Sequence, residues 1–190
     1  NLLAIYGTAI ELGMESLEVL RLLSDLESVS GRFQFIVSNS NITAIVDYAH
    51  TPDALENVLK TINDIRTKNE QLITVVGCGG NRDKAKRPIM ANIATELSDK
   101  TILTSDNPRN EDPEVIINEM EQGVEPQNFK KSLSITDRKQ AIKTACQLAQ
   151  PNDIILIAGK GHETYQEVQG IRHDFDDMKT VTELLNQLNK

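Results

Sequence analysis

Apolar residues follow two alternating patterns along this chain. Residues 72–76 form a short apolar run of the kind found in strands that are buried on both faces of a sheet, and 153–158 is predicted to be a further strand. Longer segments between such runs carry apolar residues at helical spacing, as at Ala141, Ile142, Ala145 and Cys146. Strands that alternate with helices predict an α/β fold, with a Rossmann-like, mostly parallel sheet and helices on both of its faces.

The remaining elements follow from turn and capping residues. We expect further strands at 33–37, 42–46 and 101–104, a hairpin with Gly170 in its turn, and helices at 52–65, 84–97, after Asp112, after Asp137 and from about Asp176. Two helices, at 2–12 and 15–26, precede the first strand, and we expect the first to be mostly buried and the leucine stripe of the second to lie in a core. The break at 28–31 is interpreted as a domain boundary, which gives a short helical segment 1–31 and a domain 32–190.

Composition narrows the class of protein. A net charge of −8 and a pI near 4.9 argue against a nucleic-acid partner and against an anionic membrane surface. No apolar run reaches the length of a membrane span, and no signal peptide is recognised. The two cysteines, Cys78 and Cys146, match neither a disulfide framework nor a zinc motif, so a reducing cytoplasm is the expected compartment and no metal site is predicted. The chain starts at Asn1 within a helical pattern, and we interpret it as part of a longer protein.

The segment Asp106-Asn107-Pro108-Arg109 follows the strand expected at 101–104. Ligands of parallel α/β sheets bind at the carboxyl ends of strands. This turn places a carboxylate, an amide and a guanidinium within four residues, and Pro108 stiffens the backbone between them. Such a set can bind a zwitterion, with Asp106 facing an ammonium group and Arg109 gripping a carboxylate; the competing interpretation is an ordinary Asn-Pro turn.

Two other strand-end loops are rich in glycine. The loop at 77–84 contains Arg82, but it lacks the third glycine of a Rossmann fingerprint and the Gly-Lys-Ser/Thr of a P-loop. The loop at 159–163 carries Glu163, whereas structural or solvated roles are favoured for its Lys160 and His162. If the sheet is doubly wound, the three loops lie at one edge, and their charges suit a substrate with both ammonium and carboxylate groups.

A fourth strand-end segment, 46–53, contains Asp47 and His50. Asp47 can accept hydrogen bonds from ribose hydroxyls. His50 can act as a general base, although a lone histidine at a strand end is more often a hydrogen-bonded loop residue.

In order and near spacing, the segments 47–53, 77–83, 106–109 and 159–163 resemble motifs of the Mur ligases, most closely those that add meso-diaminopimelate. The resemblance covers essentially the whole chain. It implies ATP-dependent amide formation in peptidoglycan synthesis, on the substrate UDP-MurNAc-L-Ala-D-Glu, by way of an acyl phosphate. It further implies that 32–190 is the C-terminal, amino-acid-binding domain and that 1–31 ends the central ATPase domain.

The resemblance also assigns site residues. Those implied for diaminopimelate are Arg82, Asp106, Asn107, Pro108, Arg109, Gly159 and Glu163, and those implied for ATP are Asn1, Arg32 and Asp47. No catalytic residue and no metal ligand is implied within the chain, because the P-loop, the Mg²⁺ ligands and the carbamylated lysine of the family have no counterpart here. ATP and Mg²⁺ would be held mainly by the central domain, so the 190 residues alone are expected to be inactive.

Two alternatives stay open. One is a non-catalytic α/β module that binds an amino acid or a nucleotide. The other is a ligase of the same type that uses L-lysine, although Arg109 favours diaminopimelate because lysine has no second carboxylate for a buried guanidinium.

Overall fold

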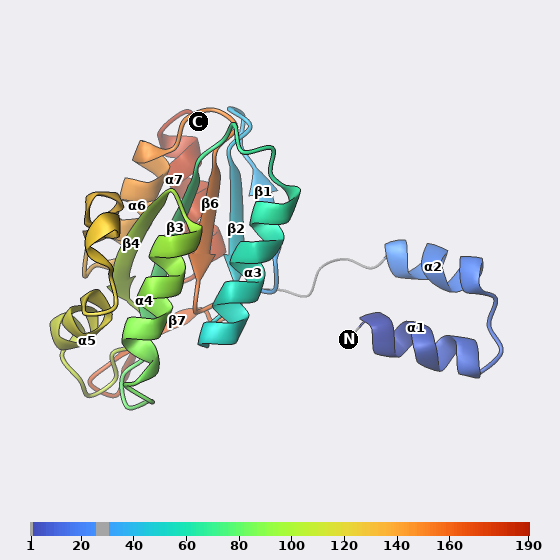
Figure 1. Ribbon diagram of the computed structural model, residues 1–190, viewed down its shortest axis with the longest axis horizontal. Coiled ribbons are helices and arrows are strands. Elements are labelled where there is room, and N and C mark those ends of the chain that lie inside the picture. Colours follow the sequence, from blue (N-terminus) through green and yellow to red (C-terminus); the bar gives the residue numbers. More distant parts are fainter. Residues whose placement is uncertain (1, 26–30) are drawn as a thin grey trace.

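The computed structural model describes residues 2–25 and 31–190, and Figure 1 shows their arrangement. A six-stranded sheet has the order β1-β2-β6-β3-β4-β5. These strands are β1 (Gln34–Val37), β2 (Thr43–Asp47), β3 (Leu72–Cys78), β4 (Lys100–Ser105), β5 (Ser132–Ser134) and β6 (Ile154–Ala158). All neighbouring pairs are parallel except β1 with β2, so the mostly parallel sheet expected from the sequence is confirmed.

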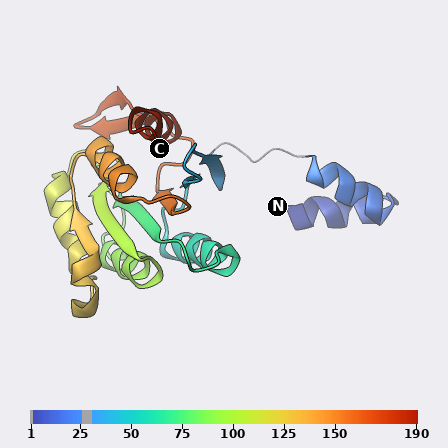
Figure 2. The same ribbon diagram turned by 90° about the horizontal axis from the view of Figure 1, so that it is seen from above.

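Helices cover both faces of the sheet, as Figure 2 shows from above. One face carries α3 (Pro52–Ile65), α4 (Lys86–Leu97) and α5 (Pro113–Glu121), and the other carries α6 (Arg138–Leu148) and α7 (Asp177–Gln187). Side chains alternate along β3: Leu72 and Val76 join the core under α3–α5, whereas Ile73 and Val75 join the core under α6 and α7. This two-sided burial explains why the run at 72–76 contains only apolar residues and threonine.

Local capping fixes the helix starts. Thr51 accepts a hydrogen bond from the backbone N–H of Ala54, and Asp112, Asp137 and Asp176 cap α5, α6 and α7 in the same way. Each of these starts was predicted from the sequence and is confirmed. The hairpin is confirmed as well, with β7 (Tyr165–Val168) and β8 (Ile171–Asp174) on either side of Gly170.

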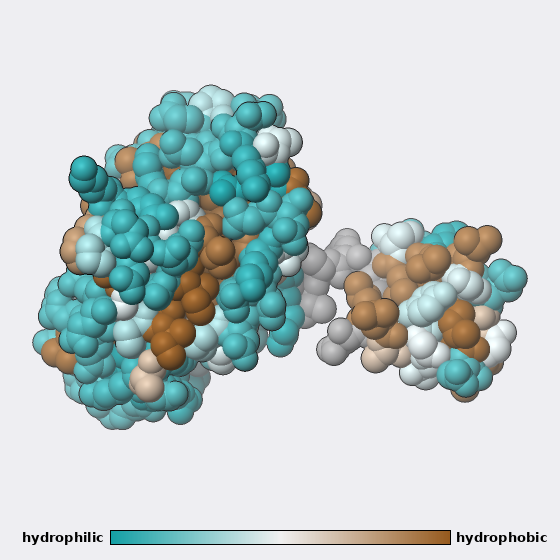
Figure 3. All heavy atoms as spheres, in the orientation of Figure 1, coloured by the Kyte–Doolittle hydropathy of each residue, from teal (hydrophilic) through white to brown (hydrophobic). Residues whose placement is uncertain are grey.

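The N-terminal helices α1 (Leu2–Glu11) and α2 (Ser16–Ser24) form a pair that stands apart from the sheet in Figure 1. The prediction that α1 is mostly buried and that the α2 leucines are core is wrong. No residue of α1 is buried, Val19 is the buried residue of α2, and Leu3 and Leu17 are 87% and 75% exposed. Each helix covers the other on one side only, so large apolar side chains face outward, as Figure 3 shows. The boundary predicted at 28–31 falls largely outside the described residues.

Two short elements were not predicted. A 3₁₀ helix, η1 (Pro126–Lys131), leads into the three-residue edge strand β5. Leu133 of β5 is 47% exposed, so the strand carries little of the apolar pattern that reveals its longer neighbours.

Candidate functional site

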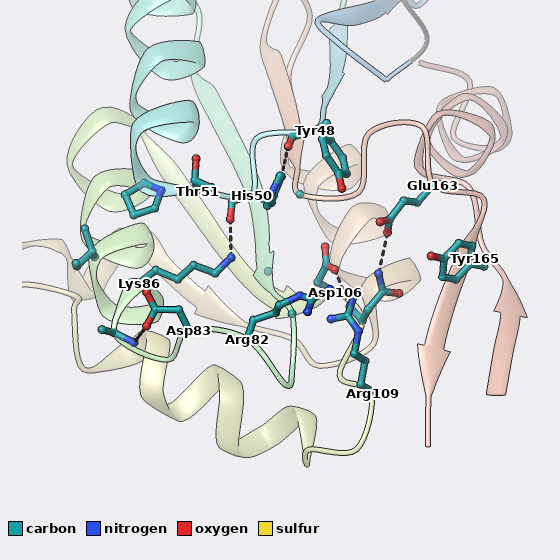
Figure 4. A pocket seen from close by; sticks show the side chains of 17 residues that line it. Tyr48, His50, Thr51, Arg82, Asp83, Lys86, Asp106, Arg109, Glu163 and Tyr165 are labelled. Atoms are coloured by element: carbon teal, nitrogen blue, oxygen red, sulfur yellow. Dashed lines mark hydrogen bonds between the residues drawn. The ribbon is translucent and has the colours of Figure 1, made fainter. Parts of the chain in front are cut away.

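A cleft of about 630 Å³ opens at the carboxyl ends of β3, β4 and β6. Strand register aligns these ends, because Val76 pairs with Ala158 and Cys78 pairs with Ser105. The loops that leave the three strands therefore meet at one edge. In Figure 4 the side chains of Arg82, Asp106, Arg109 and Glu163 point toward this common space. Its lining residues are Tyr48, His50, Thr51, Pro52, Gly77, Gly79, Arg82, Asp83, Ala85, Lys86, Ile89, Asp106, Asn107, Arg109, Gly159, Glu163 and Tyr165.

Asp106 follows β4 directly and is 8% exposed. Its Oδ1 accepts a hydrogen bond from the backbone N–H of Asn107 at 2.7 Å. Within residues 2–25 and 31–190, its Oδ2 has no hydrogen-bond partner, although it lies so close to Gly159 that a β-carbon there would approach it to 2.7 Å. A buried carboxylate oxygen without a donor is costly, so this atom suits a ligand that brings an N–H or an ammonium group.

The Asn107 amide links the turn to two other segments. Its Nδ2 donates to Glu163 Oε2 at 2.7 Å, and its Oδ1 accepts from Lys160 Nζ and from the backbone N–H of Glu167. Every polar atom of the amide is thereby engaged, which fixes both its orientation and that of Glu163.

Arg109 has a left-handed backbone, with φ of +52°. Its N–H donates to the carbonyl of Glu167 and its own carbonyl accepts from Gln169, so a bridge to the β7–β8 hairpin holds this unusual conformation. The guanidinium donates to the carbonyl of Gly80 at 2.9 Å and lies 3.9 Å from the Glu167 carboxylate. It remains 21% exposed at the cleft, so it has donors available for an anionic group.

The glycine loop after β3 packs directly on the same turn. The N–H of Gly80 donates to the Asn107 carbonyl, and a β-carbon on Gly80 would lie 1.9 Å from the carbonyl oxygen of Pro108. Glycine is required here because the two backbones touch.

A buried ion-pair network anchors this loop from behind. Arg87, fully buried in α4, donates to both carboxylate oxygens of Glu111, to Glu119, and to the carbonyl of Gly79. Burial alone would lower the pKa of Arg87, but its hydrogen bonds to Glu111 and Glu119 outweigh this and raise it. Those bonds from Arg87, with a further one from the N–H of Asn81, lower the pKa of Glu111 to about 2.

The third loop leaves β6 through Gly159, whose φ is +118°. Lys160 is fully buried, and its Nζ lies 3.1 Å from Asn107 Oδ1 and 3.2 Å from Glu163 Oε2. Of the two roles favoured for Lys160 from the sequence, structural or solvated, its burial and contacts agree with the structural one.

The cleft brings together most of the residues expected to bind an amino acid. Arg82, Asp106, Asn107, Arg109, Gly159 and Glu163 all line it. Pro108 does not line it: this residue is buried in the turn, where its carbonyl packs on Gly80.

Two of the residues expected on the ATP side, Arg32 and Asp47, lie outside this lining. Arg32 is exposed, and Asp47 ends β2 with its Oδ2 accepting a 2.7 Å hydrogen bond from the N–H of Phe33. Asn1 falls outside the described residues.

Several cleft residues were missed at the sequence level. Lys86 donates to the carbonyl of His50 at 2.7 Å and thereby ties α4 to the segment after β2. Tyr48 packs against the rings of His50 and His162, and Tyr165 lines the cleft from β7. His50 was noticed in the strand-end segment 46–53, but nothing in the sequence indicated that the β7–β8 hairpin reaches the cleft.

The open parallel sheet and its strand-end cleft define an α/β ligand-binding domain of the doubly wound class. Within that class the chain belongs to the Mur ligase family: residues 31–161 match the family model described as Mur ligase, glutamate ligase domain.

Similar proteins agree with this assignment. The chain is 59% identical over 190 residues to UDP-N-acetylmuramoyl-L-alanyl-D-glutamate--2,6-diaminopimelate ligase of Cytophaga hutchinsonii. The match covers 100% of this chain and 39% of that protein. A solved structure of a ligase with the same name has 42% identity and a TM-score of 0.78, over 99% of this chain and 38% of that one. UDP-N-acetylmuramate-alanine ligase of Thermotoga maritima, at 19% identity and a TM-score of 0.66 over 98% of this chain and 36% of its own, shares the fold. The chain thus spans 35–39% of the length of the curated relatives that it matches.

Proposed function

We propose that this chain is the amino-acid-binding part of an ATP-dependent ligase that joins meso-diaminopimelate to UDP-MurNAc-L-Ala-D-Glu. The relatives that match the whole chain carry 2,6-diaminopimelate in their names. In the proposed reaction a carboxylate of the nucleotide-linked peptide takes the γ-phosphoryl group of ATP, which releases ADP and gives an acyl phosphate. The amino group of diaminopimelate then attacks the acyl carbon, and the amide bond forms as inorganic phosphate leaves and the nitrogen loses a proton. The chain's own residues would bind and orient that amino acid.

The observation that carries the proposal is the unpartnered Oδ2 of Asp106. Among the described residues it is a buried carboxylate oxygen without a donor, and it lies in a cleft that also contains the Arg109 guanidinium. An ammonium on Oδ2 and a carboxylate on Arg109 would satisfy both groups at once. A free amino-acid centre has this pair of charges on one carbon atom.

Arg109 supplies the argument for diaminopimelate over L-lysine. Diaminopimelate carries an amino-acid centre at each end, so one centre can react while the other is held by Asp106 and Arg109. Lysine ends in an ammonium alone and would bring no carboxylate to the guanidinium of Arg109, whose donors on the cleft side would stay without a ligand partner in a closed site, at a cost in free energy.

We further propose that ATP binds on the side of the domain where β1 and β2 lie. Asp47 would accept from the ribose, Arg32 would face the phosphates, and Asn1 would contact the adenine. The exposed leucines of α1 and α2 support the proposal that residues 1–31 belong to a central ATPase domain, because they have an apolar surface to cover. Among residues 2–25 and 31–190 no three His, Cys, Asp or Glu residues form a metal cluster, and the proposal places the Mg²⁺ ligands outside this chain.

The domain contains two buried free thiols, Cys78 and Cys146, and we place its function in the reducing cytoplasm, where the nucleotide substrates are made. No helix among the described residues is long and apolar enough to cross a membrane.

The test is the amino-acid dependence of ADP release by the full-length protein that carries this chain. With ATP, Mg²⁺ and UDP-MurNAc-L-Ala-D-Glu present, meso-diaminopimelate should support turnover and L-lysine should not. Turnover with lysine alone would assign the ligase that uses lysine, and binding of an amino acid without turnover would assign the non-catalytic module.

Arg109→Ala sharpens this test. Loss of a charge-assisted pair in a closed site costs about 2–5 kcal/mol, so kcat/KM for meso-diaminopimelate should fall tens- to thousands-fold. Arg109→Lys should keep only part of the wild-type kcat/KM for meso-diaminopimelate, because an ammonium group cannot reproduce the planar pair of donors of a guanidinium. Arg21→Ala, which removes an exposed arginine of α2 that lies outside the cleft lining, is the matched control.

Arg109→Gly serves as the control for backbone strain, because glycine adopts the φ of +52° found at this position without a steric penalty. The loss of activity should be the same for Ala and Gly, and near-normal kcat/KM in both would contradict the proposed role of the guanidinium.

A further inference from the structure

Lys160 lies behind the cleft lining, and the proposed function does not explain its role. Lys160 is fully buried, and a buried ammonium is costly unless it is paired and hydrogen-bonded. Its Nζ contacts two residues that line the cleft, Asn107 at 3.1 Å and Glu163 at 3.2 Å, and it lies 5.6 Å from the centre of the Tyr165 ring.

These contacts form a closed triangle. Lys160 donates to the oxygen of the Asn107 amide, and the amide nitrogen of Asn107 donates to Glu163 Oε2, which Lys160 also contacts. Two donors therefore converge on Oε2. Within residues 2–25 and 31–190, Oε1 of the same carboxylate has no hydrogen-bond partner, and Glu163 lines the cleft.

The triangle also fixes which way the amide of Asn107 faces. If the amide were reversed, its NH₂ group would meet the ammonium of Lys160 and the backbone N–H of Glu167, which are both donors. Glu163 would then face the amide oxygen, an acceptor against an acceptor. Lys160 and the backbone N–H of Glu167 together determine that Asn107 presents its donor to Glu163.

Charge leads to the same conclusion. Asp106 and Glu163 both line the cleft, and two carboxylates that face one space repel each other. The ammonium of Lys160 offsets that repulsion from behind the site, where no ligand can displace it.

We propose that Lys160 is a positioning residue for amino-acid binding, which fixes Glu163 and the Asn107 amide so that Glu163 Oε1 receives the ammonium group of the substrate together with Asp106 Oδ2. This inference rests on the proposed function, because it takes the occupant of the cleft to be an amino acid.

A double-mutant cycle tests it in the full-length protein with Lys160→Met, Glu163→Gln and the double variant. Hydrogen bonds to charged groups contribute enough that Lys160→Met should raise the KM for meso-diaminopimelate by about 10- to 100-fold, with the KM for ATP unchanged. Because Lys160 acts through Glu163, adding Lys160→Met to Glu163→Gln should raise the KM less than threefold further. Independent effects that multiply would overturn the proposal.

Lys131→Met is the matched control, since Lys131 donates to a backbone carbonyl, that of Ser98, and lies outside the cleft. Its KM values should stay at wild type; an equal rise for both lysine variants would mean that Lys160 acts only on stability. If Lys160→Met does not fold, Lys160→Gln keeps a donor for Asn107, and the same cycle applies to it. Turnover of the wild-type protein distinguishes the proposed function from the role of Lys160. If the wild type does not turn over meso-diaminopimelate, the proposed function is rejected. If it does, but the effects of Lys160→Met and Glu163→Gln on KM are independent, only the role of Lys160 is rejected.

Discussion

Glu111→Gln tests how the glycine loop is held in place. Glu111 accepts two hydrogen bonds of 3.0 Å from the buried Arg87 and a third from the N–H of Asn81. Glutamine keeps the shape of the side chain but removes the charge and turns an NH₂ group toward donors. The loop that carries Arg82 should therefore lose its anchor while the remainder of the fold is kept.

The expected loss in the free energy of unfolding follows from the pKa of Glu111, which falls from 4.5 to about 2 in the folded chain. At 1.36 kcal/mol per pKa unit, the shift sets an upper bound of about 3 kcal/mol on the contribution of the ionised form to the free energy of unfolding, and solvent screening at this partly exposed carboxylate lowers it. The loss on mutation should be about 2–3 kcal/mol, because Arg87 keeps Glu119 as a partner at 2.6 Å.

The sign of the pH dependence is fixed by the same values. Because the folded pKa is depressed, the contribution is fully present above pH 4.5 and is lost as the pH falls toward 2. The difference in the free energy of unfolding between wild type and Glu111→Gln should thus shrink from about 2–3 kcal/mol at pH 7 to about half of that at pH 3.

Urea unfolding of the chain, followed by circular dichroism at both pH values, measures this difference. The matched control is Glu56→Gln, which breaks an exposed pair with Lys60 on α3 and should cost under about 1 kcal/mol at either pH. A Glu111→Gln variant as stable as the control, or a difference that grows at low pH, would refute the reasoning.

Two further predictions concern the ATP side and the glycine loop. Asp47→Asn keeps an acceptor for the N–H of Phe33, so a raised KM for ATP in the full-length protein should report the lost ribose contact. Asp53→Asn is the surface control, and an unchanged KM for ATP in Asp47→Asn would leave Asp47 a purely structural residue. Gly80→Ala should lower kcat/KM for the amino acid and destabilise the domain in thermal unfolding, because its β-carbon would lie 1.9 Å from the Pro108 carbonyl oxygen. The control is Gly7→Ala in α1, whose β-carbon meets no atom within 4 Å and which should be neutral or stabilising in the same measurement.

The parts of the fold that depend on neighbouring residues were predictable from the sequence. Helix α3 has the predicted bounds, because Thr51 and Pro52 mark its start locally. The strand-end rule also predicted that the Asp106 turn and both glycine loops lie at one edge of the sheet, where the cleft is found.

Features that depend on distant residues were not predictable in this way. Arg87 and Glu111 are separated by 24 residues, and Lys160 meets Asn107 across 53. Helical spacing identified the apolar stripe of α2 but could not say what covers it, and the prediction of a core there was wrong.

Several of the long-range contacts meet at one turn, the segment from Asp106 to Arg109. The glycine loop touches it at Asn107 and Pro108, Lys160 holds the Asn107 side chain, and the hairpin pairs with Arg109. A turn held on three sides needs little ordering when a ligand binds, so the free energy of the contacts at Asp106 and Arg109 is available for affinity. It follows that variants in the supporting residues should weaken binding by loosening the turn, whereas variants of Asp106 or Arg109 should change which amino acid is accepted.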